Sequence, residues 1–108
     1  MSRQKGNIAE AKARDYLVRL GFRIVETNFY SKHGEIDIIA IKDSTLHFVE
    51  VKSGETFEPI YNINDKKLSH IIATAEYFLK LKNLSLKYCI DAIIVKGDDI
   101  EMCENITM

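Results

Sequence analysis

Two short apolar runs, separated by a polar turn, most strongly constrain how this chain can fold. The runs are residues 34–41 (GEIDIIAI) and 46–52 (LHFVEVK), and the segment between them reads KDST. Short runs that are rich in Ile and Val and bounded by turn-forming residues are typical of neighbouring β-strands joined by a hairpin. The sequence therefore predicts an antiparallel pair of strands at the centre of the fold.

The expected turn also predicts which residues face one another across this hairpin. Antiparallel partners have residue numbers with a constant sum, so a turn centred on residues 43–44 pairs Asp37 with Glu50 and Glu35 with Lys52. Because side chains alternate between the faces of a strand, these four share one face, with the Cβ atoms of direct partners roughly 5 Å apart. Three carboxylates and one amine are expected to converge there.

The predicted pairing of Asp37 with Glu50 requires a compensating charge, because like charges directly opposite one another destabilise a sheet. A hard divalent cation such as Mg²⁺ supplies that charge, since it takes oxygen ligands that commonly include one or two carboxylates. Lys52 adds a positive group two residues beyond Glu50. The alternative is a hairpin with solvated acids, in which a Lys52–Glu35 ion pair contributes little. The spacing alone leaves both interpretations open.

Composition limits the class of protein further. A chain of 108 residues suits a single domain spanning residues 1–108. With 15 Lys and Arg against 16 Asp and Glu, the formal charge is −1, so any nucleic-acid-binding surface must be local. Cys89 and Cys103 lack the paired spacing of a zinc site, and we expect both to be small buried residues in a reducing compartment. No signal peptide or membrane-spanning run is evident, which predicts a cytoplasmic protein without a membrane partner.

Helical periodicity marks residues 7–20 as the first helix. One stripe of this segment carries the apolar side chains, which are Ala9, Ala13, Tyr16, Leu17 and Leu20. Glu10 lies at the edge of this apolar stripe, from which its carboxylate can reach a site on the buried side of the helix. The other interpretation is that Glu10 is an acid near the start of a helix, favoured there by the helix dipole alone.

The same periodicity predicts a second helix over residues 65–82, with Asn64 as its N-cap. Its stripe consists of Leu68, Ile71, Ile72, Ala75, Phe78 and Leu79. Lys66 and Lys67 lie in its first turn, where cations oppose the helix dipole. This placement is expected if the start of the helix meets an anion such as a phosphate, although exposed lysines at a helix start are also common.

Two connections flank the central hairpin. Residues 28–33 contain Tyr30, Lys32 and His33, an aromatic ring and basic groups just before the first acidic strand. Such a loop could contact a phosphate backbone, and the alternative is an ordinary solvated connection. Residues 53–65 show no clear period and predict a loop long enough to be functional.

The remaining pattern predicts an α/β fold with a mixed central sheet flanked by helices. Residues 36–41 are apolar on both faces, which is typical of a strand with helices covering both sides of its sheet. The other strands are expected at residues 22–27, at residues 88–95 and, weakly and at an edge, at residues 100–106. The expected order is helix, three strands, helix, strand, with an extra C-terminal edge strand.

These motifs together resemble the YraN-like family of small bacterial predicted endonucleases. The resemblance lies in AE in the first helix, NFYSKHGEIDIIA, FVEVK, and the lysine-led helix KLSHIIATAEYFL. That family is in turn similar to archaeal Holliday junction resolvases and, more distantly, to restriction endonucleases. The resemblance implies a restriction-endonuclease-like core. It also places Asp37 as the first acid of an acid…acid-x-Lys site, Glu50 and Lys52 as its E-x-K, Glu10 as the helix-one glutamate and Lys67 as the helix-two lysine.

The function implied is hydrolysis of phosphodiester bonds in DNA, including branched DNA, by a nuclease that uses Mg²⁺ or Mn²⁺. Asp37 and Glu50 are expected to hold the ion, together with the carbonyl of Val51, and Glu10 to add an outer or second-metal ligand. Lys52 is expected to orient the attacking water, and Glu35 to position Lys52. Related resolvases act as symmetric dimers, so the resemblance also allows a homodimer.

Two departures from the family pattern keep alternatives open. Close relatives have an arginine soon after the E-x-K lysine, whereas residues 53–56 here are SGET, and Tyr30 stands where relatives commonly place a basic residue. Fewer cations weaken DNA binding, because phosphate neutralisation supplies much of the affinity. The main alternative is a nucleic-acid-binding module with the nuclease fold and little catalysis, and a further one is an adaptor protein of a larger assembly.

Overall fold

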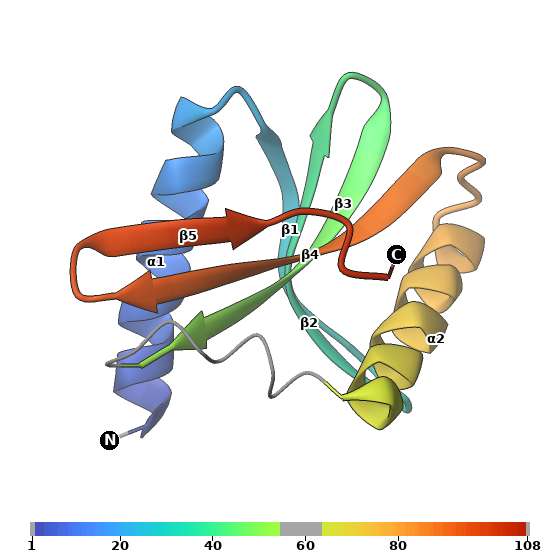
Figure 1. Cartoon of the computed structure of the whole chain (residues 1–108). Coiled ribbons are helices and arrows are strands. Elements are labelled where there is room, and N and C mark those ends of the chain that lie inside the picture. The colour runs from blue at the N-terminus through green and yellow to red at the C-terminus, as the bar shows by residue number, and fades with distance from the viewer. Residues whose placement is uncertain (1, 55–63, 108) are drawn as a thin grey trace.

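The computed structural model describes the backbone of residues 2–54 and 64–107, and the side chains of these residues except 2–6. Over this part, five strands form one sheet in the order β1-β2-β3-β4-β5, with helix α1 on one face and α2 on the other (Figure 1). The elements are α1 (Ser2–Arg19), β1 (Arg23–Ser31), β2 (Gly34–Lys42), β3 (Thr45–Ser53), α2 (Asp65–Leu81), β4 (Lys87–Lys96) and β5 (Asp99–Cys103). The predicted mixed sheet flanked by helices is confirmed.

The sheet is mixed because one of its neighbouring strand pairs is parallel. Strand β2 is antiparallel to both of its neighbours, β1 and β3, and β4 and β5 form a further antiparallel pair. Strands β3 and β4 are parallel and are joined through α2, so this helix lies on the crossover connection. Parallel neighbours need such a crossover, whereas the antiparallel pairs can be joined by tight turns.

Each helix covers an apolar layer on its own face of the sheet. The α1 layer includes Ala13, Leu17, Ile38 and Val49, and the α2 layer includes the residues Phe29, Ile36, Ile39, Phe48, Ile71 and Phe78. Phe78 meets both Phe29 and Phe48 edge to face, with ring centroids 5.0 and 5.8 Å apart, an arrangement that aromatic quadrupoles favour. Burial on both faces explains why β2 is apolar on both sides.

The apolar residues predicted to face the core from each helix are buried or partly buried, with one exception. Ala9, Ala13 and Leu17 are buried, and Asn64 caps α2 by accepting a hydrogen bond from the Lys67 N–H through its side chain. Leu20 was expected in the core but is 42% exposed, because α1 ends at Arg19 and the chain turns at this point. No helix in the described ranges is both long and apolar enough to cross a bilayer.

The first and last strands differ from their predicted limits. Strand β1 extends to Ser31, which pairs with Gly34, so Tyr30 lies in a strand and only residues 32–33 form the turn that was predicted as part of a longer loop. Strand β5 lies at an edge as predicted but ends at Cys103, and Ile106 instead donates its N–H to the carbonyl of Ile90 at 2.8 Å. Most of the loop predicted over residues 53–65 lies outside the described residues.

The turn between β2 and β3 contains two residues, Asp43 and Ser44. Their φ angles are +52° and +64°, and the flanking pair is Lys42 with Thr45. A two-residue hairpin with positive φ at both central positions matches the twist of the strands, but it strains residues that have a Cβ atom. Asparagine and aspartate tolerate this conformation better than serine does, so we expect the strain to lie mainly at Ser44.

Replacing Ser44 with glycine is expected to stabilise the protein by about 0.5–1 kcal/mol, because glycine adopts positive φ without strain. Urea denaturation would measure the change in the free energy of unfolding. Ser85→Gly is the matched control, since Ser85 is exposed in a connecting segment and is not among the residues with positive φ. Equal effects of the two substitutions, or destabilisation by Ser44→Gly, would contradict this explanation.

Candidate active site

The predicted register of the central hairpin is confirmed. The paired residues of β2 and β3 run from Lys42 with Thr45 to Ile38 with Val49. The predicted pair of Asp37 with Glu50 lies one position beyond the last of these pairs and is not itself part of the regular ladder. There the Asp37 carboxylate accepts a hydrogen bond from the Val51 N–H at 2.7 Å. A side-chain oxygen thus binds the backbone of the neighbouring strand just where the regular pairing ends.

Asp37 lies in an environment that disfavours its charged form. Its pKa is raised to about 7, first by burial and then by the negative charge of Glu50, with smaller contributions from Glu10 and Glu35. The hydrogen bond from Val51 acts in the opposite direction but does not compensate. Carboxylates from α1, β2 and β3 therefore act on one another electrostatically, as the sequence predicted. We refer to Glu10, Glu35, Asp37 and Glu50 as the acidic cluster.

Asn28 connects two members of this cluster. Its side-chain amide donates to Glu10 and to Glu35, with both N–O distances 3.0 Å. Asn28 has a φ of +51°, which asparagine adopts more readily than most residues. Sequence reasoning placed it in a loop and missed this role. An asparagine that contacts one acid on the neighbouring strand and another on a helix is recognisable only once the packing of these elements is known.

Two lysines share one oxygen of Glu50. Lys67, from the first turn of α2, lies 2.7 Å from Glu50 Oε2, and Lys52 lies 3.8 Å from the same atom. Burial lowers the pKa of Lys52, and the neighbouring ammonium group of Lys67 lowers it further. Burial acts on Lys67 in the same direction, but its hydrogen bonds with Glu50 and Lys52 and the negative charges of Glu50 and Asp37 together outweigh burial and raise its pKa.

The predicted pairing of Glu35 with Lys52 is not part of the register. The paired residues of β2 and β3 end at Ile38 with Val49, before they reach these positions. Glu35 is held by Asn28 instead, and Lys52 approaches Glu50. The acids and the lysine of the predicted site thus remain neighbours, but the amine is positioned by a different carboxylate.

A cavity of about 370 Å³ lies beside the acidic cluster, between the β1–β2 turn and the start of α2. Its lining includes His33, Glu35, Lys66 and Lys67. Three of the five residues predicted to contact nucleic acid therefore meet at one hollow next to an acid of the cluster. The other two, Lys32 and Tyr30, are exposed on the same hairpin and do not line this cavity.

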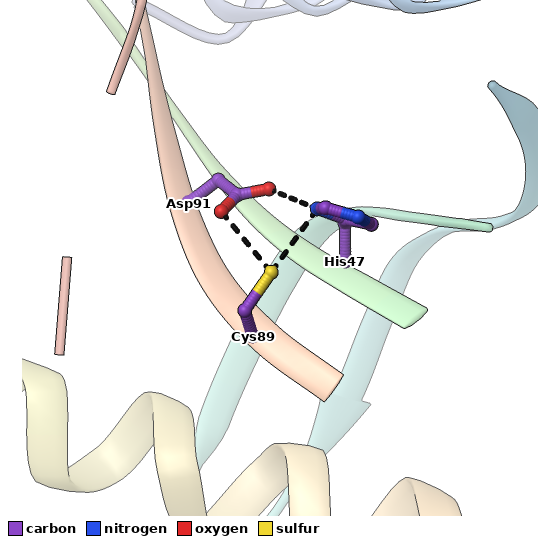
Figure 2. Close-up of side chains that lie close together, drawn as sticks. All are labelled: His47, Cys89 and Asp91. Atoms are coloured by element: carbon purple, nitrogen blue, oxygen red, sulfur yellow. Dashed lines mark hydrogen bonds and ion pairs between the residues drawn. The ribbon is translucent and has the colours of Figure 1, made fainter. Parts of the chain in front are cut away.

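A second group of polar side chains was not predicted. The group consists of His47 on β3 and of Cys89 and Asp91 on β4 (Figure 2). Their ligand atoms all lie within 4.8 Å of one another, and among the described residues this is the only set of three or more His, Cys, Asp or Glu side chains that does so. Cys89 was expected to be a simple buried residue. Spacing in the sequence could not predict this group, because His47 and Cys89 are brought together by the parallel pairing of β3 with β4.

The oxygen ligands of the acidic cluster suit Mg²⁺ or Mn²⁺. Hard cations take carboxylate oxygens, and a cation would offset both the burial and the charge of Glu50 that raise the pKa of Asp37. Asp37 Oδ2 already accepts the Val51 N–H, which leaves Oδ1 as the oxygen without that bond. Glu50 Oε2 is paired with Lys67, so an ion at Glu50 must share this carboxylate with an amine.

Comparison with known proteins identifies relatives along the whole chain. The profile of a family described as "Uncharacterised protein family UPF0102" matches residues 9–95, a range that contains the acidic cluster and both lysines. A UPF0102 protein of Wolinella succinogenes is 54% identical over 108 residues, covering 100% of both chains. A UPF0102 protein of Helicobacter hepaticus is 48% identical over 99% of this chain and 97% of its own. One from Helicobacter pylori strain HPAG1 is 53% identical over 97% of this chain and 92% of its own.

The raised pKa of Asp37 predicts that stability falls as pH rises. Below the ordinary value of 3.8 the carboxyl group is protonated in both states, and between 3.8 and about 7 the native state binds more protons than the unfolded state. The free energy of unfolding therefore decreases through this window, by on the order of 2–4 kcal/mol from this group. Asp37→Asn should remove that component. Urea denaturation at pH 4 to 8 would measure it.

The control for this measurement is Asp15→Asn, which changes an exposed aspartate on α1. It is expected to retain the pH dependence of the unsubstituted protein. If Asp37→Asn showed the same decline in stability between pH 4 and 7 as Asp15→Asn, the electrostatic description of the cluster would be wrong.

Proposed function

The chain belongs to the uncharacterised protein family UPF0102, and we propose that it is a metal-dependent endonuclease that hydrolyses phosphodiester bonds in DNA. The observation that carries this proposal is the approach of Asp37 to Glu50 at the point where β2 and β3 separate, beside Lys52. The order of helices and strands and the mixed sheet are those expected of the restriction-endonuclease-like core that the sequence resembles.

The charge of the site supports binding of a divalent cation. The four carboxylates of the acidic cluster face two ammonium groups, those of Lys52 and Lys67, which leaves a surplus of two negative charges when all are ionised. Asp37, Glu50 and the main-chain carbonyl of Val51 would hold Mg²⁺ or Mn²⁺, with Glu10 as a further ligand. When bound, such an ion stabilises charge on a phosphate and lowers the pKa of a coordinated water.

Lys52 is placed to assist hydrolysis from within the cluster. Its side chain is only 24% exposed and lies beside Glu50, which holds the amine near the carboxylates. Its lowered pKa reflects burial and the neighbouring Lys67. From this position the amine can donate a hydrogen bond to the attacking water or offset the negative charge that develops on the phosphate. Glu35, held by Asn28, adds negative charge at the border of the site.

DNA is favoured as the substrate by the basic groups beside the acids. Lys66, Lys67 and His33 line the cavity next to Glu35, at the start of α2. The helix N-terminus and two lysines together form a positive region suited to a phosphate. Because Glu35 and Lys67 line this cavity, a phosphate bound there would lie beside the acidic cluster. Branched DNA, the substrate of the resolvases that the sequence resembles, belongs to this substrate class.

One observation favours a second function. The Lys67 amine lies 2.7 Å from Glu50 Oε2 and so competes with a metal ion for one of its principal ligands. A site in which Lys67 keeps this place would retain the fold and the phosphate contacts but have little catalytic activity. The alternative is therefore a nucleic-acid-binding module, and the experiments below separate it from an enzyme.

Loss of Asp37 or Lys52 is expected to abolish most DNA cleavage. With linear and branched DNA and Mg²⁺ or Mn²⁺, we expect Asp37→Asn and Lys52→Met each to reduce the cleavage rate by roughly 10²-fold or more, because each removes a group that acts at the reacting phosphate. Asp15→Asn and Lys87→Met, which change exposed residues on α1 and β4, are the matched controls.

Cleavage that is equal in the site variants and the controls would show that the activity belongs to a contaminant or to another site. Binding of branched DNA without cleavage by the unsubstituted protein, retained in Asp37→Asn, would support the binding module instead. Gel-shift measurements at several salt concentrations would report the number of phosphate contacts in either case.

Removing Lys67 should strengthen metal binding while weakening DNA binding. Lys67→Met frees Glu50 Oε2 and removes a positive charge from the site, so we expect Mn²⁺ affinity to rise roughly tenfold, equivalent to about 1.4 kcal/mol. Isothermal titration calorimetry would measure it, with Lys66→Met as the neighbouring control. Unchanged Mn²⁺ affinity in Lys67→Met would place the ion away from Glu50.

A further inference from the structure

His47, Cys89 and Asp91 form a second polar site on the other face of the sheet. Side chains alternate between the two faces of a strand. On β3, His47 lies two positions before Val49, which packs in the layer under α1, and three positions before Glu50, which therefore points to the other face. Cys89 and Asp91 lie on the neighbouring strand β4, where Cys89 pairs with His47 and Asp91 with Val49. All three side chains therefore share the α1 face, away from Glu50 and the lysines that contact it.

The three ligand atoms converge on one small region (Figure 2). His47 Nδ1 lies 2.5 Å from Asp91 Oδ2 and 3.1 Å from Cys89 Sγ, and Cys89 Sγ lies 3.4 Å from Asp91 Oδ1. The imidazole is held edge to face against Phe22, with ring centroids 4.8 Å apart. A nitrogen, a sulfur and a carboxylate thus face one another from two adjacent strands.

The surroundings hold this group in place. Asp91 is 0% exposed and His47 9% exposed, so the carboxylate must be compensated by neighbours rather than by bulk water. The Asn105 N–H donates to Asp91 Oδ1 at 2.8 Å, which ties the segment after β5 to the site. A hydrogen bond of this kind from outside the ligand set orients a carboxylate, as commonly occurs around protein-bound metals.

The geometry does not suit a nucleophilic cysteine. In a Cys–His–Asp triad the imidazole uses one ring nitrogen for the thiol and the other for the carboxylate. Here the same atom, Nδ1, contacts both Cys89 and Asp91. Convergence on a single point instead suits a shared ion.

We propose that His47, Cys89 and Asp91 bind a Zn²⁺-type divalent metal ion through Nδ1, Sγ and a carboxylate oxygen. Nitrogen, thiolate and carboxylate are the ligands that zinc takes in proteins, at about 2.0–2.3 Å, which separates neighbouring ligand atoms by roughly 3.3–3.6 Å in a tetrahedron. The present separations of 2.5–3.4 Å require only a small opening. As the metal–ligand bonds form, the Cys89 thiol proton and the proton shared by His47 Nδ1 and Asp91 are released to solvent.

His47 also lines a cavity of about 510 Å³, together with Tyr16, Phe22 and Glu104, whereas Cys89 and Asp91 do not line it. A water molecule is the ligand assigned to the fourth position of the tetrahedron. The ion would join β3, β4 and the segment after β5, because Asn105 is bonded to Asp91. This site is independent of the proposed nuclease activity, and its nitrogen and sulfur ligands select a softer ion than the oxygen ligands of the acidic cluster.

Titration of the full-length, metal-free protein with Co²⁺ under reducing conditions tests this proposal. Co²⁺ replaces Zn²⁺ in such sites and reports its ligands through a thiolate-to-cobalt charge-transfer band and the intense visible bands of tetrahedral cobalt. We expect both bands to saturate at one equivalent, and Zn²⁺ but not excess Mg²⁺ to remove them. Zn²⁺ should also raise the thermal unfolding midpoint by several degrees, because it binds only the folded protein.

Variants distinguish this site from the other metal ligands of the chain. Cys89→Ser and Cys89→Ala should lose the charge-transfer band, whereas Cys103→Ser, which removes the other cysteine, and Asp37→Asn, in the acidic cluster, should retain it. Circular dichroism would confirm that each variant is folded. Absence of the band in the unsubstituted protein, its persistence in a folded Cys89 variant, or its loss in Cys103→Ser would overturn the proposal.

Discussion

The acidic cluster depends on the point at which β2 and β3 separate. A two-residue turn sets the register of these strands, and the register brings Asp37 next to Glu50 from the neighbouring strand. Because the regular pairing ends one position earlier, the Val51 N–H is taken by the Asp37 carboxylate rather than by the partner backbone. The carboxylate is thereby fixed among other acids, and its raised pKa follows from that position.

The helices complete the site from opposite faces of the sheet. Helix α1 brings Glu10, which Asn28 links to β2, and helix α2 brings Lys67 to Glu50. The two amines offset part of the charge of the four carboxylates, and the excess negative charge that remains favours a cation. Competition between Lys67 and a cation for Glu50 is therefore the feature that separates the two proposed functions.

The sequence predicted the hairpin because its register depends only on a short turn, and it predicted both helices because their apolar stripes are continuous. Contacts that depend on tertiary packing could not be predicted in the same way. The Lys67–Glu50 pair arises from how α2 docks on the sheet, and Asn28 reaches its acids from a left-handed conformation. His47 meets Cys89 through parallel strands joined by a long connection, which leaves no local spacing signal.

The most direct test of the central claim is a crystal structure with Mn²⁺ in which the ion is located by its anomalous scattering. We expect an anomalous peak between the carboxylates of Asp37 and Glu50, with the Lys67 amine moved away from Glu50 Oε2 and the Val51 N–H still bound to Asp37. A peak elsewhere on the molecule, or no peak while Lys67 remains paired with Glu50, would contradict it.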